Sequence, residues 1–487
     1  AKEPNRGGTV DLAAQDPQIA MERLTPAEGY AVNLFASEKQ FPLGNPISFT
    51  FDGKGRLWVL TTPSYPQRLP DRMPDDKLII LEDTDGDGQA DKHIVFANDL
   101  HVPTGFEIGD GGVYIAQQPN LIFVRDTDGD EVADTRQSIL HGFGTEDSHH
   151  AISVFTWGPG GGLYFQEGTF HHSQVETPYG PVRVENAAVF RFEPRTYKFS
   201  AFVSYNYANP WGHVIDRFGQ NFISDASNGN NHFGTAYSGH VNFPDKQAVI
   251  KNWTTTKVRP TSGIEFVRSR HFPDDAQGNF LINNVIGFHG IKQYQVREEG
   301  SGFVGEEIEP LLVSSDINFR PADLQFGPDG ALYVCDWFNP LIGHMQYSVC
   351  DPHRDHSHGR IWRITHKDRP LLDPTDITTM SLLNQLDQLK VYEDRIRYRA
   401  RRALREHPTA QVTTALEQWI AALDRSNTNH EHHLMEALWI YQQHDVVKTE
   451  LLERLLRADE PRVRAAAVRV LQHWHHRIPN AMSLLRQ

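Results

Sequence analysis

Two pairs of histidines bracket one short segment of the chain. His149 and His150 precede it, His171 and His172 follow it, and Pro-Gly-Gly-Gly divides the apolar residues between them into two runs. Such runs predict a β-hairpin, whose two ends lie on the same side, so we expect all four imidazoles close together. A neutral imidazole, with an ordinary pKa of about 6.5, accepts a proton from a hydroxyl group or binds a transition metal. The segment therefore predicts an acid–base or metal site, the alternative being hydrogen-bonded surface histidines.

Other residues of kinds that bind cofactors and substrates are expected on the same side of the sheets. The candidates for catalysis are His150, His149, Arg320 and Asp225. The candidates for binding a cofactor or substrate are Asn209, Trp211, Arg259, Arg320, His171, His172, His344, His356 and His358. Arginines and aromatic faces suit a carboxylated, planar cofactor. The His-x-His spacing of His356 and His358 directs both rings to one side of an extended segment, which favours a bound transition metal instead.

Two further loops carry four aspartates each within nine residues. They are Asp83, Asp85, Asp87 and Asp91 in "DTDGDGQAD", and Asp126, Asp128, Asp130 and Asp134 in "DTDGDEVAD". Carboxylates at this spacing, with a glycine for the turn, suit a hard cation such as Ca²⁺. We therefore expect structural Ca²⁺ on the side opposite the histidines, the alternative being solvated acidic turns without metal.

The elements that must position these residues show an internal repeat of about 50 residues. The units begin near Asn45, Val102, Ala151, Asn209, Arg259 and Arg320. Each unit holds about four short runs of alternating apolar residues around a glycine-rich turn, which is typical of strands. Six such units around an axis make an all-β six-bladed β-propeller, and a solenoid is the alternative. We expect an N-terminal arm over residues 1–30 and the propeller over residues 31–368.

The repeat also distinguishes His150. Other units have Gly44, Ala208 and Phe319 at its position, so the fold itself does not require a histidine there. We therefore expect His150 to act as the base of an active site at the mouth of the propeller, with the remaining candidates positioning cofactor and substrate.

Helical periodicity replaces the strand pattern in the last part of the chain. Leu404, Leu438 and Leu471 recur at spacings of 34 and 33 residues within segments that have the 3.6-residue period. This favours a C-terminal α-helical domain of HEAT-like repeats over residues 369–487, and we expect the natural protein to continue beyond it.

Composition narrows the range of functions. The formal net charge is -15, which disfavours nucleic-acid binding, and no apolar run reaches the ~18–20 residues of a membrane span. The first residues lack the apolar core of a signal peptide. Cys335 and Cys350 do not form the motif that attaches a c-type haem, and they are either one disulfide or two isolated thiols.

Several motifs resemble a known family. "LEDTDGDGQADK", "GFGTEDSHHA", "RHFPDDAQGNFLINNVIGFHG" and "RDHSHGR" look like the propeller of membrane-bound dehydrogenases of the planctomycete and verrucomicrobial type, over about two-thirds of the chain. More distantly, the propeller is similar to soluble glucose and sorbosone dehydrogenases, which carry PQQ and use a histidine base at the place of His150. That wider family commonly has Arg-Asn-Pro where this chain has Ala208, Asn209 and Pro210. The nearer family often appends HEAT repeats and a c-type cytochrome.

The resemblance implies an extracytoplasmic oxidoreductase, periplasmic or secreted and associated with a membrane through parts outside this chain. It would oxidise a sugar or other alcohol and pass electrons to a c-type cytochrome. A metal-dependent polysaccharide lyase or hydrolase that uses the histidine cluster is one alternative. A carbohydrate-binding propeller without catalysis is another.

Overall fold

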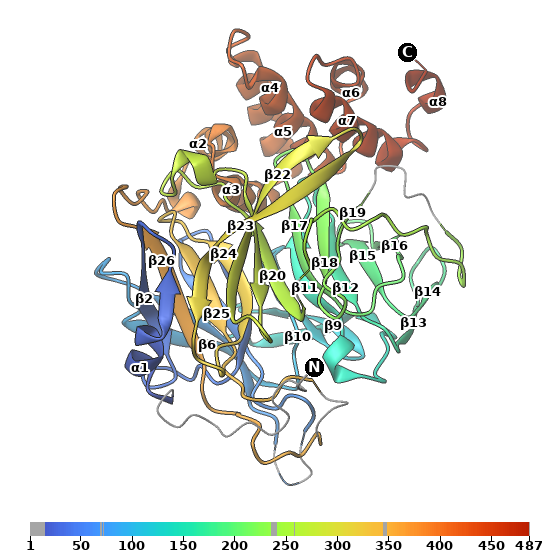
Figure 1. The fold of residues 1–487 in the computed structure, drawn as a ribbon. Coiled ribbons are helices and arrows are strands. Elements are labelled where there is room, and N and C mark those ends of the chain that lie inside the picture. Colours follow the sequence, from blue (N-terminus) through green and yellow to red (C-terminus); the bar gives the residue numbers. More distant parts are fainter. Residues whose placement is uncertain are drawn as a thin grey trace.

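Six sheets stand around a central axis in the computed structural model, which describes residues 15–68, 71, 73–234, 241–257, 259–343 and 348–486 (Figure 1). Blade 1 contains β3 (Pro46–Phe51), β4 (Leu57–Thr61), β5 (Asp76–Glu82) and β6 (Lys92–Leu100). Blade 2 contains β7 (Phe106–Gly109), β8 (Gly112–Gln117), β9 (Asn120–Arg125) and β10 (Thr135–His141). Blade 3 contains β11 (Ser153–Trp157), β12 (Leu163–Glu167), β15 (Ala188–Glu193) and β16 (Lys198–Val203), and the separate hairpin β13 (His172–Val175) and β14 (Val182–Glu185) rises between its second and third strands.

The remaining blades follow the same order of strands. Blade 4 has three described strands, β17 (Pro210–Ile215), β18 (Asn221–Asp225) and β19 (Asn231–Gly234). Blade 5 contains β20 (Thr261–Phe266), β21 (Phe280–Asn284), β22 (Gly290–Glu299) and β23 (Gly302–Ser314), and β1 (Leu24–Pro26) pairs with β23. Blade 6 contains β24 (Pro321–Phe326), β25 (Leu332–Asp336), β26 (Arg360–His366) and, outermost, β2 (Tyr30–Ser37).

The first strands of the blades form a closed ring. Each contacts its neighbour in the order β3, β7, β11, β17, β20, β24 and back to β3. The N-terminal β2 completes blade 6 by pairing antiparallel with β26, which ties the start of the propeller to its end. This topology confirms the predicted six-bladed β-propeller and excludes the solenoid.

A helical region follows the propeller. It contains α2 (Leu382–Asp387), α3 (Asp394–Glu406), α4 (Thr409–Ala421), α5 (His430–Gln443), α6 (Thr449–Leu455), α7 (Pro461–Trp474) and α8 (Ala481–Leu484). The recurring leucines, Leu404, Leu438 and Leu471, are buried in α3, α5 and α7, and these helices pack in that order. The predicted helical region is thus confirmed, while its assignment as HEAT-like repeats stays a prediction.

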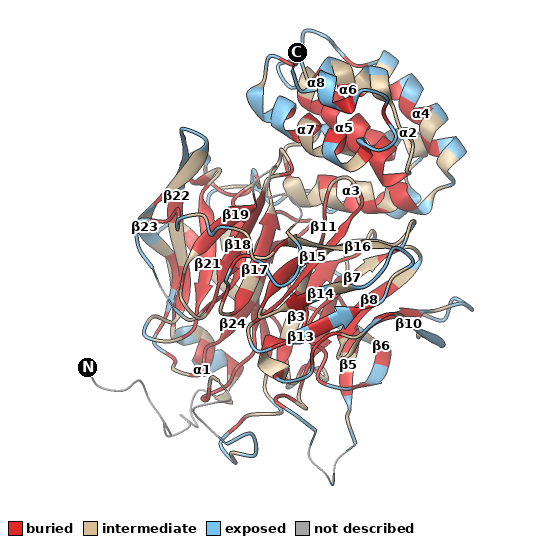
Figure 2. Cartoon of the chain, turned by 90° about the vertical axis from the view of Figure 1, so that its right-hand side faces the viewer, coloured by how far each residue is buried: buried red, intermediate tan, exposed pale blue. Residues whose placement is uncertain are grey.

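The helical region covers one end of the propeller, and α3 is its layer nearest the strands (Figures 1 and 2). We call this end the helix face and the other end, where the first strand of each blade begins, the open face. Arg395 of α3 pairs with Glu265 of blade 5 at 2.5 Å, and Arg402 pairs with Glu107 of blade 2 at 2.9 Å. Both carboxylates are buried, so these pairs fix α3 across the helix face.

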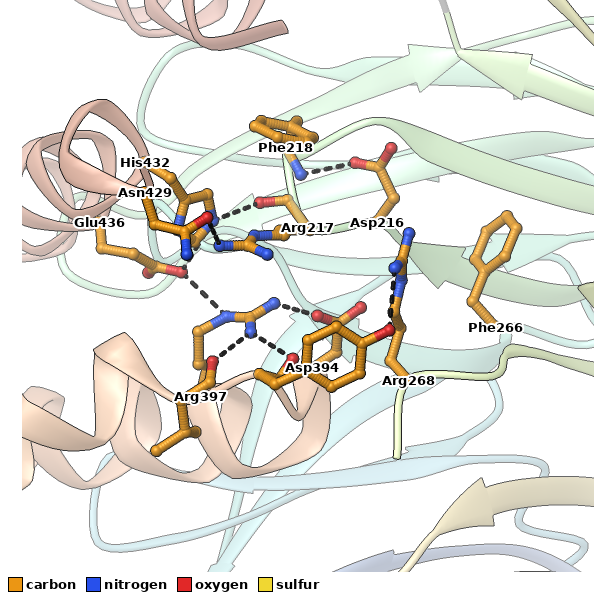
Figure 3. Close-up of polar contacts among 12 residues, drawn as sticks. Asp216, Arg217, Phe218, Phe266, Arg268, Asp394, Arg397, Asn429, His432 and Glu436 are labelled. Carbon is orange, nitrogen blue, oxygen red and sulfur yellow. Dashed lines mark hydrogen bonds and ion pairs between the residues drawn. The ribbon is translucent and has the colours of Figure 1, made fainter. Parts of the chain in front are cut away.

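A second group of polar contacts joins the helices to blade 4 (Figure 3). Arg217 donates to Asn429 at 2.9 Å, and its backbone carbonyl lies 3.1 Å from Nε2 of His432. Beside them, Arg397 bridges Asp394 and Glu436 within the helical region. The helix face is therefore closed by polar contacts as well as by packing.

Candidate functional site

A cavity of about 120 Å³ lies at the open face, and all six blades contribute to its wall. Its wall includes the side chains of Tyr65, His149, Asn209, Trp211, Arg320 and Trp337. Serine and threonine residues also contribute to the wall, but the hydroxyl groups of Thr104, Ser148 and Ser262 donate to backbone carbonyls, and the pocket surface is predominantly apolar. Indole and phenol faces with an amide and a guanidinium group suit a ligand that has an apolar face and a few polar groups.

A tyrosine and a histidine form the reactive pair of this cavity, which we call the mouth pocket. Oη of Tyr65 lies 2.5 Å from Nδ1 of His149, and the Tyr65 ring packs edge-on against Trp337 at 5.2 Å. Burial raises the pKa of Tyr65 above its ordinary value, so the phenol stays protonated and donates to Nδ1 in the tautomer of His149 that carries its proton on Nε2. The pair is thus arranged to move a proton from the pocket, through the phenol oxygen, to His149.

The backbone before blade 3 fixes the direction of His149. Ser148–His150 is a single turn of 3-10 helix, and the Asp147 carboxylate accepts the His149 N–H at 2.9 Å. Successive residues of such a turn point about 120° apart. His149 and His150 are therefore directed to different places although they are neighbours in sequence.

His150 points away from the mouth pocket. It is buried, its Nδ1 lies 3.0 Å from the carbonyl oxygen of Thr169, and its ring stacks on Phe170 at 5.5 Å. The prediction that His150 is the base rested on counting residues from the strand. The structure places His149, and not His150, in the wall of the pocket, because the 3-10 turn separates the two rings.

The second histidine pair has its own surroundings. His171 is fully buried, its Nε2 lies 2.8 Å from the carbonyl oxygen of Asp147, and burial lowers its pKa. This contact with Asp147, the residue that caps the 3-10 turn, holds the start of the turn in place. His172 is exposed at the start of β13, with its Nδ1 3.2 Å from Glu146. Neither side chain lines the mouth pocket.

Arg320 is the cation among the described residues of the pocket wall. Its Nη1 lies 3.3 Å from Nε2 of His289, whose pKa is lowered to about 4 by burial and by the arginine's charge. His289 is therefore neutral. Trp211 crosses the pocket floor and donates its Nε1–H to the carbonyl of Ala322 at 3.3 Å. Arg320 also donates to the backbone carbonyls of Phe319 and Pro340, and its guanidinium and the Trp211 indole belong to the same pocket wall as the Tyr65–His149 pair.

Asp225, a predicted catalytic residue, belongs to the framework of blade 4. It is fully buried and accepts the backbone N–H groups of Ala208 at 2.7 Å and Asn209 at 3.1 Å. Asp336 does the same in blade 6, where it accepts the Arg320 N–H at 2.9 Å. Both aspartates end the second strand of their blade, a repeat position that the sequence displays in "NFISD" and "LYVCD". Asp225 positions Asn209 and does not line the pocket.

The remaining binding candidates lie elsewhere on the open face. Arg259 is exposed, with Nη1 3.4 Å from the carbonyl of Ser227. His356 bonds to the carbonyl of Pro63 at 2.7 Å, and His358 pairs with Asp355 at 2.6 Å, so the two rings do not converge. His344 lies outside the described residues.

The acidic loops lie on the helix face, as expected, since each joins the third and fourth strands of its blade. Carboxylate oxygens come within 4.8 Å of one another for Asp83, Asp85 and Asp91, and for Asp126, Asp128 and Asp130. Asp87 accepts the N–H of Gln89 and Asp134 accepts the hydroxyl of Thr127. Within the described residues no group of three or more such ligands includes a histidine, which gives the predicted histidine-bound metal no preformed site.

Sequence reasoning missed Tyr65. It follows β4, the second strand of blade 1, in a proline-rich segment without a motif. Its position in the repeat was a usable signal, because segments that follow the second strand of a blade emerge at the open face. Tyr65 is the tyrosine of the first such segment.

Two other expectations concern the chain as a whole. Cys335 is buried in β25 and Cys350 is exposed, and the two thiols are not bonded to each other. None of the described helices has the length and apolar character that crossing a membrane requires.

Comparison with known proteins adds a family and several distant folds. A luciferin-regenerating enzyme shares 9% identity at a TM-score of 0.43, over 70% of this chain and 97% of that chain. The PQQ-bound aldose sugar dehydrogenase from Streptomyces coelicolor shares 14% at 0.41, over 70% of this chain and all (100%) of that one. A gluconolactonase from Xanthomonas campestris shares 10% at 0.37, over 72% and 97%. Such likeness does not bear on chemistry, and the propeller rests on the sheet topology above.

No curated protein matches the sequence. The family described as "Domain of unknown function (DUF7133)" matches residues 16–368, which span the whole propeller. The chain therefore belongs to the DUF7133 family.

Proposed function

We propose that this protein is an enzyme that acts on a sugar or other alcohol bound in the mouth pocket. The observation that carries the proposal is the Tyr65–His149 pair, at 2.5 Å, inside a predominantly apolar pocket with aromatic side chains in its wall. Aromatic faces pack against the apolar C–H faces of a sugar ring, while Asn209 and Ser227 offer hydrogen bonds to its hydroxyl groups.

The pair supplies the proton transfer that alcohol chemistry needs. A ligand hydroxyl near Tyr65 passes its proton to the phenol oxygen as the phenol passes its own proton to Nδ1 of His149. Arg320, nearby in the wall, stabilises the negative charge that develops on the ligand oxygen. Loss of the hydroxyl proton is one half of the oxidation of an alcohol, and the second half transfers a hydride to an acceptor.

The pocket does not fit PQQ as its acceptor. PQQ is a tricarboxylate, and Arg320 is the cation that the described pocket wall offers. No step is therefore assigned to PQQ, whose binding stays a prediction. Oxidation outside the cytoplasm and electron transfer to a c-type cytochrome are likewise proposals, supported by the resemblance of the motifs.

A lyase or hydrolase is the second candidate. The observation that favours it is that Tyr65 and His149 form an acid–base pair beside a guanidinium, which is sufficient for elimination or hydrolysis without a redox group.

The product distinguishes these candidates. The full chain is incubated with a panel of sugars, oligosaccharides and alcohols and a soluble dye as electron acceptor, with and without added PQQ, and products are identified by mass spectrometry. We expect dye reduction and a product lighter by two hydrogen atoms. An unsaturated or shortened sugar without dye reduction assigns the second candidate. Binding without any product makes the propeller a carbohydrate-binding protein and contradicts both.

A further inference from the structure

A row of aromatic rings leads out of the mouth pocket along the open face. From Trp337 it passes to Tyr65 at 5.2 Å and to His149 at 5.9 Å between ring centroids. From His149 it continues to His150 at 5.4 Å and to Phe170 at 5.5 Å. The first three rings line the pocket, His150 is buried, and Phe170 is 44% exposed. The row therefore runs from the pocket wall, through a buried ring, to an exposed aromatic side chain.

Phe170 adopts a backbone conformation that phenylalanine residues rarely take. Its φ of 75° lies in the left-handed region, which a bulky side chain rarely adopts and which costs about 1–3 kcal/mol. Contacts on both sides impose this conformation. The His150 ring bonds to the carbonyl of Thr169 at 3.0 Å, and the Asn186 side chain accepts the Phe170 N–H at 3.0 Å. Backbone strain of this kind, maintained by its surroundings, is typical of functional sites.

The size of the pocket bears on the length of its ligand. A cavity of about 120 Å³ is too small for a chain of several sugars, so a longer ligand can bind there only with its further sugars outside the pocket. The exposed Phe170 ring offers the apolar surface on which a pyranose stacks.

We infer that the ligand of the mouth pocket is an oligosaccharide, and that Phe170 is the platform for a sugar ring outside the pocket. This inference rests on the proposed function and adds the class of substrate to it. Phe170 is a specificity-determining residue, and His150 is the support that holds its ring in position.

Chain length is the variable that tests this inference. Affinities of the full chain are measured by titration calorimetry for mono-, di- and trisaccharides of the β-glucan, xylan and polygalacturonate series. In the series that binds, we expect the trisaccharide to bind at least about tenfold more tightly than the monosaccharide, given the contribution of one stacked ring.

Two variants distinguish the contribution of the Phe170 ring to binding from its contribution to folding stability. Phe170→Gly removes the ring and accepts a φ of 75° without strain, so its melting temperature is expected to equal or exceed that of the wild type. Its affinity for the monosaccharide stays unchanged, while the advantage of the trisaccharide falls to less than about threefold. The matched control is Tyr179→Ala. Tyr179 is a 67% exposed aromatic residue outside the row of rings, on the loop of the β13–β14 hairpin that follows Phe170 in the chain. It should leave both affinities unchanged.

The outcomes are distinct. Equal affinity for mono- and trisaccharide in the wild type, or a chain-length advantage that survives in Phe170→Gly, overturns the inference and leaves the proposed function standing. Binding of none of the three series by the wild type overturns the inference together with the proposed substrate class. A loss that is equal for mono- and trisaccharides also overturns it, because Phe170 would then act on the pocket itself.

Discussion

At the scale of single residues, two adjacent histidines have different tasks. His149 accepts a hydrogen bond from a buried phenol in the pocket wall, whereas His150 bonds to a backbone carbonyl and supports Phe170. The division comes from the 3-10 turn that Asp147 caps, since this turn directs consecutive side chains apart.

A pair of glutamine variants tests that division. Glutamine at position 149 can still accept the Tyr65 hydrogen bond but cannot take up a proton, so His149→Gln should lower turnover at least about a hundredfold with a nearly unchanged melting temperature. His150→Gln is the matched control and should lower turnover less than about tenfold. Kinetics on the substrate found in the screen, with thermal melts, provide the measurement. The reverse ranking would restore His150 as the base.

The histidine of the blade 6 connection makes stability depend on pH. The hydrogen bond that His358 donates to the Asp355 carboxylate raises the pKa of His358 above its ordinary 6.5, and the same bond helps lower the pKa of Asp355. A raised histidine pKa contributes stability that is fully present below pH 6.5 and is lost as pH rises through the folded-state value. We expect the wild type to melt higher than His358→Gln at pH 5.5 and this difference to shrink by pH 8.5. A difference that is constant or grows over this interval would show that the pair does not titrate as described.

The candidate site could be predicted from the sequence only in part. The repeat and the paired histidines located the open face and included His149, Asn209, Trp211 and Arg320 among the candidates. Local pattern could not choose between His149 and His150, because the choice depends on one turn of backbone. It also gave no sign of Tyr65, whose contact with His149 joins residues 84 positions apart.

At the scale of elements, the two acidic loops join neighbouring blades. The backbone N–H of Ala90 donates to Phe35 of β2 at 2.8 Å, and that of Ala133 donates to Phe96 of β6 at 2.7 Å. Each loop thus adds a bond to the outermost strand of the preceding blade. The same loops bring their carboxylates together, where the charges repel one another unless a cation binds.

We therefore propose that Ca²⁺ in these loops stabilises the junctions between blades. EDTA should lower the melting temperature and excess Ca²⁺ should restore it, because an ion that binds the folded state stabilises it by mass action. Asp85→Ala and Asp128→Ala should each reduce that response, while Asp368→Ala, an exposed aspartate outside the loops, should not. Melting curves that are indifferent to EDTA and Ca²⁺ would mean that the loops are solvated acidic turns.

Strands and helices were more predictable than the way they join. Alternating apolar residues and glycine-rich turns marked the inner strands of all six blades. The pairing of β2 with β26 joins residues more than 300 positions apart, and the β13–β14 hairpin adds strands outside the repeat. Such pairings depend on the closed ring, which no local pattern encodes.

At the scale of the molecule, the helical region is part of the propeller's structure. The arginines of α3 have their partners far away in the sequence, and Arg402 and Glu107 are separated by 295 positions. Because α3 closes the helix face, the described pocket is reached from the open face. We therefore expect the helix face to contribute to stability and the open face to bind the ligand.

Removing residues 376–487 tests this expectation. The docking of α3 further predicts that two substitutions have opposite effects on stability in the full and in the truncated chain. In the full chain, Glu107→Gln should lower stability by about 3–5 kcal/mol, because it leaves the buried Arg402 of α3 without its carboxylate, and Glu265→Gln should lower it by less, because Arg395 is only partly buried. In the truncated chain the arginines are gone, and each glutamate is left without the cation that offsets its burial, so a neutral amide costs less there and the same two substitutions should raise the melting temperature. Urea denaturation and thermal melts supply the comparison, and sugar affinity at the open face should be the same in both chains below the transition. Substitutions that act in the same direction in both chains would contradict the docking of α3, and a truncated chain that folds but loses sugar affinity would contradict the separation of the two faces.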